Sequence, residues 1–206
     1  MTDRRDFVAS CGALVLALSG CQSLLSRTRL AHLALADPHP DDYEPVLGAL
    51  IATILPFDHP RFPRVSAAEL QERLLALFPL GEEQYLVLQK GLMVFDRLDL
   101  FPVLQTPMVA EARALQDASD AAIAACAAQD RRRYLVWRRA FPSDATSFTA
   151  LQPPARTAYF RLWGQSGFNS KALFYTSAKR LVMITAYSMR DFWRAIGYAG
   201  PLLKPS

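Results

Sequence analysis

Apolar positions along the chain recur every three or four residues in one segment after another, the spacing of helices that each bury one face. Prolines and glycines separate these segments, and neither alternating β-branched runs nor Asn-Gly or Asp-Gly turns indicate a hairpin. The pattern predicts helices over residues 43–55, 66–78, 82–100, 153–163, 170–187 and 189–196, with one or two more between 108 and 141. The sequence therefore predicts an all-α fold, a single compact domain of six to eight helices.

Two of these helices carry residues typical of helix ends. Ser66 is followed three residues later by Glu69, which is the pair found in a capping box. Asp41 or Asp42 is expected to cap the first helix, and Pro56 is expected to end it.

The beginning of the chain has a different pattern, a single apolar run with a charged front. The run from Phe7 to Gly20 covers 14 residues. A membrane-spanning helix needs about 20, whereas the apolar part of a signal peptide needs about 7–15. Arg4 and Arg5, with Phe7 two residues further on, resemble the twin-arginine export signal of bacteria, which directs folded proteins to the Tat translocase.

The end of the apolar run carries a second signal. Residues 18–21, Leu-Ser-Gly-Cys, resemble a lipobox, in which Cys21 takes a lipid and becomes the new N-terminus. The alternative is an uncleaved signal anchor in which Cys21 is a passive thiol. We expect residues 1–20 to form a twin-arginine and lipoprotein signal peptide, 21–42 a tether, and 43–206 the helical domain. The protein is then a periplasmic lipoprotein held at the membrane of the bacterial cell envelope through Cys21.

Composition and charge indicate what kind of surface to expect. The chain is 51% hydrophobic and 20% charged, with a formal net charge of +4. A mildly basic surface suits anionic phospholipid or an acidic partner and does not by itself indicate nucleic acid. The arginines at 131–133 and 138–139 are interpreted as a solvated helix face, a lipid-headgroup contact or a partner contact, and no nucleic-acid partner is expected.

Candidate chemistry is sparse. The sequence holds no Gly-rich phosphate loop, nucleophile elbow, H-E-x-x-H motif or Cys/His ligand spacing, so we expect no catalytic, cofactor-binding or metal-binding residues. Asp96 and Asp99 come closest to a carboxylate pair for acid–base work, but ion pairing with Arg97 is the favoured interpretation. Cys126, in an Ala-rich segment, is expected to be buried at a close helix contact, the alternative being an intermolecular bridge.

Two segments resemble a known family. "LVMITAYSMRDFWRAIGYAGPLL" is similar to the C-terminal signature of the gluconate 2-dehydrogenase subunit 3 family, and "LGALIATILPFDHP" (Leu47 to Pro60) is similar to its first helix and the turn that follows. The residues that fall on the C-terminal pattern are Tyr187, Trp193, Ile196, Gly197, Tyr198, Gly200 and Pro201. A twin-arginine leader is also typical of this family, whereas the lipobox is not a feature of every member. The Arg- and Ala-rich middle carries no family motif.

The resemblance implies a non-catalytic small subunit with no cofactor of its own. Such subunits escort, stabilise and anchor a FAD-dependent dehydrogenase of the glucose–methanol–choline (GMC) type, which oxidises sugars or alcohols and lacks its own signal. A c-type cytochrome often accepts the electrons. Trp193, Tyr198 and Pro201 would pack the domain or contribute to the partner interface. The alternatives are a stand-alone helical envelope lipoprotein with a structural or binding role, and an enzyme with an unrecognised site.

Overall fold

The computed structural model describes residues 39–57, 59–60, 62–63, 65–77, 82–102 and 120–195. The expected signal residues Arg4, Arg5 and Phe7, the lipid-attachment residue Cys21, and the expected interface residues Tyr198 and Pro201 lie outside the described residues.

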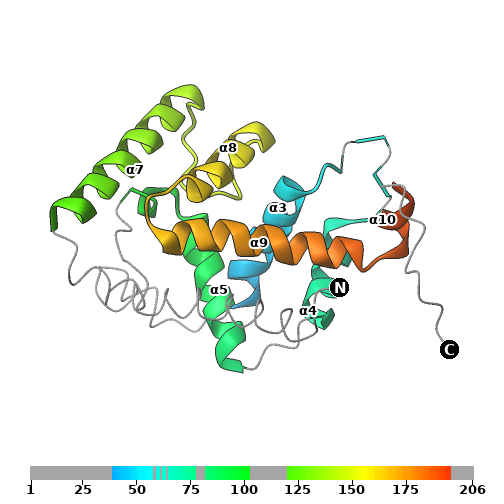
Figure 1. Cartoon of the computed structure of the whole chain (residues 1–206). Helices are drawn as coiled ribbons and strands as arrows, with labels where there is room; N and C mark the ends of the chain where they lie inside the picture. Colours follow the sequence, from blue (N-terminus) through cyan, green and yellow to red (C-terminus); the bar gives the residue numbers. More distant parts are fainter. Residues whose placement is uncertain are drawn as a thin grey trace.

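The regular elements of the described chain are helices (Figure 1), which confirms the predicted all-α class. Its elements are α3 (Pro40–Ile54), α4 (Ala67–Leu77), α5 (Glu82–Asp96), the 3-10 helix η1 (Leu98–Leu100), α7 (Asp120–Ala140), α8 (Pro153–Gly164), α9 (Asn169–Tyr187) and α10 (Arg190–Ala195). In these ranges the extended pairing amounts to an isolated antiparallel bridge between Arg97 and Ser147.

Helix α9 organises the domain. It contacts α8, α4, α3 and α10, while α3 also packs on α4, α5 and α8, and α7 packs on α8. Its 19 residues span about 28 Å. Helices α7 and α10 therefore lie at opposite ends of the molecule (Figure 1).

The core is built around the aromatic ring of Phe95, at the end of α5, which is fully buried. Ring centroids of Phe148, Tyr159, Phe160, Trp163 and Phe174 lie 4.6–6.1 Å from it. The Tyr159 hydroxyl donates a hydrogen bond to the Phe95 carbonyl oxygen at 3.4 Å. Aromatic pairs of this kind add to the stabilisation from burial alone, so α5, α8 and α9 are joined at this cluster.

The first helix begins earlier than predicted. Neither Asp41 nor Asp42 is the N-cap; the cap is His39, whose Nδ1 accepts a hydrogen bond from the Asp41 N–H at 3.3 Å. The Asp42 carboxylate in turn accepts a hydrogen bond from the His39 N–H at 3.1 Å. Both aspartates thus lie in the first turn of α3, where a negative charge is favourable beside the positive end of the helix dipole.

The cap predicted for α4 is confirmed. Ser66 Oγ accepts a hydrogen bond from the Glu69 N–H at 3.0 Å, and the helix begins at the next residue, Ala67. On this helix Leu70 and Leu74 are buried, whereas Leu77 at its end is 36% exposed.

The helix predicted over residues 82–100 ends at Asp96 and is followed by η1. The reason is a contact with a distant segment. The Asp96 carbonyl accepts a hydrogen bond from the Phe148 N–H at 2.7 Å, and the Leu98 N–H donates to the Thr146 carbonyl at 3.1 Å. These bonds replace the helical ones and turn the chain.

Candidate functional site

The two aspartates singled out in the sequence have different environments. Asp99 forms a two-point ion pair with Arg97, with donor–acceptor distances of 2.9 and 2.8 Å, at the surface. Asp96 instead accepts a hydrogen bond from the Thr149 N–H at 2.9 Å through its Oδ1. The predicted ion pair with Arg97 is confirmed for Asp99. It is wrong for Asp96, whose carboxylate binds the backbone N–H of Thr149 instead. The two carboxylates are thus engaged with different partners.

A charged pair that the sequence analysis missed lies inside the domain. Lys171 on α9 is 2% exposed and Asp130 on α7 is fully buried, with 2.6 Å between Lys171 Nζ and Asp130 Oδ2. Lys171 Nζ also donates to the Phe101 carbonyl at 2.8 Å and lies 4.3 Å from the centre of the Phe101 ring. The lysine therefore joins η1, α7 and α9.

The Asp130 carboxylate has two further neighbours. Ser166 Oγ donates to its Oδ2 at 2.6 Å and accepts a hydrogen bond from the Phe168 N–H at 3.0 Å. Arg133 Nη1 lies 3.8 Å from the Oδ1 of Asp130, which has no hydrogen bond within the described residues. The cluster fixes the connection between α8 and α9 against α7.

Burial changes the pKa of the Lys171 amine. Removal from water lowers the pKa of Lys171 below its ordinary 10.5, and the hydrogen bond and charge of Asp130 oppose that shift. A depressed lysine pKa is a feature of some catalytic sites, but here the amine is enclosed by Phe101, Phe168 and Asp130. Lys171 and Asp130 therefore form an ion pair that connects α9 to α7 inside the domain.

A signal for this pair was present in the sequence. Lys171 lies at the same helical register as the buried Phe174, Ala178 and Val182 of α9. Asp130 lies seven residues before the buried Trp137 of α7. A charged residue of opposite sign on the apolar face of each of two helices indicates a buried ion pair.

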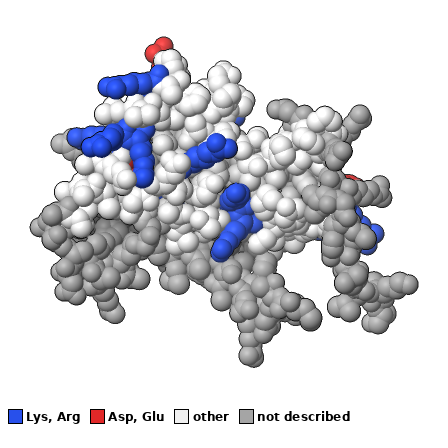
Figure 2. All heavy atoms as spheres, turned by 45° about the horizontal axis from the view of Figure 1, so that its top comes forward, with Lys and Arg blue, Asp and Glu red and all other residues white. Residues whose placement is uncertain are grey.

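The arginines of α7 divide into two groups. Arg133 donates to the Gln165 carbonyl, and Arg138 donates to the carbonyls of Ser143 and Ala145 at 2.9 Å each. The other three, Arg131, Arg132 and Arg139, are exposed and make no ion pair with the described part of the chain. Figure 2 shows that Lys and Arg side chains spread over this face of the molecule, with few carboxylates among them.

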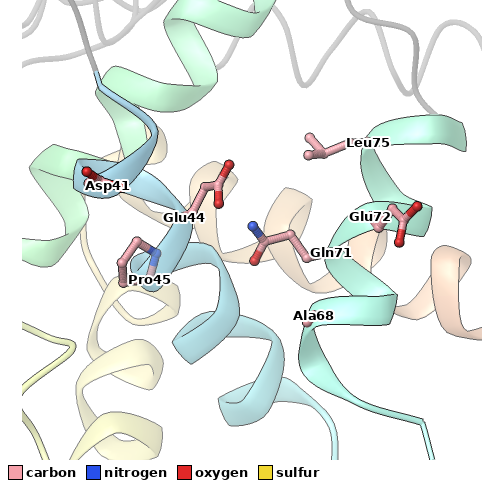
Figure 3. A pocket seen from close by; sticks show the side chains of 7 residues that line it. All are labelled: Asp41, Glu44, Pro45, Ala68, Gln71, Glu72 and Leu75. Atoms are coloured by element: carbon pink, nitrogen blue, oxygen red, sulfur yellow. The ribbon is translucent and has the colours of Figure 1, made fainter.

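In contrast to the arginines of α7, acidic side chains line a groove between α3 and α4. It has a volume of about 620 Å³ and is lined by Asp41, Glu44, Pro45, Ala68, Gln71, Glu72 and Leu75. Gln71 extends from α4 across the groove towards Glu44 on α3 (Figure 3). Within the described ranges, no group of three or more His, Cys, Asp or Glu side chains is placed to hold a metal ion.

Cys126 is half-buried on α7 rather than fully buried as expected. It does make a close contact, since a Cβ added to Gly167 would lie 3.0 Å from the cysteine Sγ. The contact is with the short connection between α8 and α9, not with another helix.

The two segments that carry the family resemblance are linked by a ring that lies between them. The ring of Phe62, just after the first segment, lies 5.0 Å from Phe57 of that segment and 4.9 Å from Phe192 on α10, centroid to centroid. At the same end of the molecule the half-buried Trp193 donates its indole N–H to the Tyr187 carbonyl, and Tyr187 itself is 43% exposed. We call the rings of Phe57, Phe62 and Phe192, with Tyr187 and Trp193, the C-terminal corner.

Comparisons with protein-family models, with curated proteins and with solved structures give no match to this chain. Among the described helices, none is long and apolar enough to cross a membrane.

Proposed function

We propose that the chain is a non-catalytic small subunit that escorts, stabilises and anchors a FAD-dependent GMC-type dehydrogenase of the periplasm. The FAD belongs to the partner, the Tat translocase carries the complex, and in complexes of this kind a c-type cytochrome often accepts the electrons. The observation that carries the proposal is the C-terminal corner. Two segments that separately resemble one family, far apart in sequence, are linked by Phe62, whose ring contacts Phe57 of the first segment and Phe192 of the second.

The corner has the chemistry of a protein interface. Tyr187 exposes 43% of its surface at the end of α9, and Ile184, one turn earlier, exposes 37%. Aromatic residues are enriched where proteins meet because they offer a large apolar area and few freely rotating bonds. The indole N–H of Trp193 is bonded inside the chain, so this side chain orders the corner while its neighbours are available to a partner.

The first test is isolation of the tagged protein from membranes in mild detergent, followed by an absorbance spectrum and mass spectrometry. We expect a flavin spectrum and a co-isolated dehydrogenase. A colourless protein that still carries lipid on Cys21 would contradict the escort role and favour the stand-alone lipoprotein. A tight small-molecule cofactor on the purified chain alone would favour an enzyme.

The second test concerns export. Replacing both Arg4 and Arg5 by Lys is expected to keep this chain and the flavoprotein in the cytoplasm, because the signal reads the arginine pair. The matched control is Arg73→Lys with Arg190→Lys, which changes two exposed arginines of the domain and leaves the leader intact. Export of the flavoprotein despite the altered leader would refute the escort role.

The third test concerns the corner itself. Tyr187→Ser should reduce the amount of co-isolated dehydrogenase, whereas Val136→Ser, which removes a 60% exposed side chain at the other end of the molecule, should not. Equal recovery with both variants would place the partner elsewhere on the domain.

A further inference from the structure

The charges of this chain are separated along its length and on its surface. Residues 39–100 contain ten Asp and Glu against five Lys and Arg, whereas residues 121–190 contain eleven Lys and Arg against two Asp and no Glu. Asp130 and Lys171 are both buried and paired with each other, which leaves ten Lys and Arg against Asp144 in this range. Helices α7, α8 and α9 consequently carry a strongly basic surface (Figure 2).

The outward side of α7 combines this charge with exposed aliphatic groups. Leu135 and Val136 are 49% and 60% exposed. Arg131 and Arg132 lie one turn before them and Arg139 lies one turn after them, all exposed. Apolar side chains flanked by arginines on one helix are typical of helices that rest in the interfacial region of a bilayer.

From this arrangement we infer that the outward face of α7 binds the surface of a bilayer rich in anionic phospholipid. The exposed arginines contact headgroup phosphates, and Leu135 and Val136 enter the boundary between headgroups and acyl chains. The inference goes beyond the escort role and is independent of lipid on Cys21, because it rests on described residues alone.

The shape of the face favours a lipid surface over a protein. Beside the arginines, α7 has only a shallow depression of about 480 Å³, lined by Ala124, Ala127, Ala128, Arg131, Arg132 and Leu135. The small alanines let a flat, deformable surface approach the helix closely. A specific protein interface normally has a packed aromatic or aliphatic anchor in a pocket, and the described face offers none.

The position of the face agrees with this assignment. Helix α7 lies at the opposite end of α9 from the C-terminal corner (Figure 1). A lipid surface bound to α7 therefore leaves the exposed side chains of Ile184 and Tyr187 accessible to the partner of the proposed complex.

The inference is tested by vesicle sedimentation with the full chain. Phosphatidylcholine vesicles are compared with vesicles in which part of the lipid is phosphatidylglycerol, and the ratio of the two partition coefficients cancels the contribution of the apolar leader. Arg132→Gln with Arg139→Gln is expected to lower this ratio about thirty-fold, about five-fold per arginine. Raising the salt concentration should lower the ratio of the parent protein and have less effect on the variant.

Control variants test whether binding depends on the outward face of α7 rather than on the net charge or the overall hydrophobicity of the protein. Arg73→Gln with Arg190→Gln removes two exposed arginines from α4 and α10 and should change the ratio less than two-fold, as expected for charges away from the bilayer surface. Leu135→Ser with Val136→Ser should weaken binding to anionic vesicles, whereas Leu77→Ser, at an exposed leucine of α4, should not.

Three results would overturn the inference. The first is an unchanged ratio for the Arg132 and Arg139 double variant. The second is an equal loss with the Arg73 and Arg190 control, which would mean that only net charge matters. The third is loss of a co-isolated acidic protein with vesicle binding unchanged, which would assign the face to a protein interface.

Discussion

Lys171 and Asp130 form an ion pair inside a domain of helices, with 2.6 Å between the amine nitrogen and a carboxylate oxygen. Both side chains are at most 3% exposed. Two charges removed from water stabilise a fold only weakly as a pair, but either one left alone is strongly unfavourable.

Lys171→Met is therefore expected to lower the free energy of unfolding by about 3–5 kcal/mol, because it leaves the Asp130 carboxylate buried without its cation. Combining it with Asp130→Leu should recover most of the loss. The measurement is equilibrium unfolding in urea, with Lys179→Met, at an exposed lysine of the same helix, as the control. A double variant as unstable as the single one would show that the hydrogen bonds of Ser166 and Phe101, not the charges, dominate the site.

Tyr159 gives a prediction about alkaline pH. Its phenol is fully buried in the aromatic core, and burial raises its pKa well above the ordinary 10.0. In the unfolded chain this group ionises near pH 10.0, whereas in the folded chain it keeps its proton, so its contribution to stability falls as pH rises above 10.0. Tyr159→Phe should cost about 1 kcal/mol at neutral pH through the lost hydrogen bond to Phe95. That difference should shrink as pH is raised.

The measurement for Tyr159 is the difference in unfolding free energy between parent and variant at neutral pH and above pH 10.0. The other tyrosines are present in both proteins and cancel in the difference. A difference that does not change with pH would mean that water reaches the phenol in the folded state.

Lys171 gives the opposite trend with pH. Because its pKa is lowered on folding, the unfolded chain binds the proton more readily between the folded pKa and the ordinary 10.5. Its contribution to stability is therefore smallest at neutral pH and grows as pH rises towards 10.5. The Lys171→Met variant lacks this rise, so its unfolding free energy should increase less than that of the parent between neutral pH and 10.5. A parallel pH dependence in both proteins would contradict the lowered pKa.

Gly164, the last residue of α8, leaves no room for a larger side chain. An added Cβ would lie 2.7 Å from the ring of Tyr175 on α9. Gly164→Ala should destabilise the domain by about 1–3 kcal/mol, since the ring or the helix must shift. Gly48 of α3 is the matched control, because a Cβ there would meet Gln71 at an ordinary 3.6 Å.

Gly48→Ala is expected to stabilise the protein by up to about 1 kcal/mol through the higher helix propensity of alanine. Thermal unfolding of the two alanine variants decides the comparison. Similar shifts of the melting temperature in the same direction would show that the contact between Gly164 and the Tyr175 ring leaves room for a methyl group.

Asp96 and Asp99 should respond differently to replacement by alanine. Asp96→Ala removes the acceptor of the Thr149 N–H, and we expect a loss of about 1–3 kcal/mol. Asp99→Ala breaks an ion pair between side chains that are about half exposed, with an expected loss of at most about 1 kcal/mol. Denaturant unfolding of both variants measures the difference, and an equal loss would contradict the assigned roles.

The features predicted correctly from the sequence depend on neighbouring residues. The start of α4 follows from Ser66 and Glu69, three residues apart, and the start of α8 follows from Pro153, whose missing N–H is tolerated there. The start of α3 was misplaced because aspartate is the commoner cap and His39 took that role.

The features missed depend on residues far away in sequence. The end of α5 is set by bonds to the segment at Thr146 and Phe148, which no local pattern indicates. The pairing of Lys171 with Asp130 depends on how α9 and α7 are placed against each other. The expected partner residue Trp193 proved to be half-buried with its N–H bonded within the chain, which the sequence left open.

The corner where Phe62 meets Phe192 also determines when a newly made chain can finish folding. Helix α3 leaves the ribosome early, with Val46, Leu50 and Ile51 ready to be covered, yet α8 begins only at Pro153 and Phe192 is near the end of the described chain. Contacts between such distant segments form late, because the intervening chain must be ordered first. The domain closes only after Phe192 has been synthesised, so a chain terminated before α8 leaves uncovered the side of α3 that packs on α8 and α9.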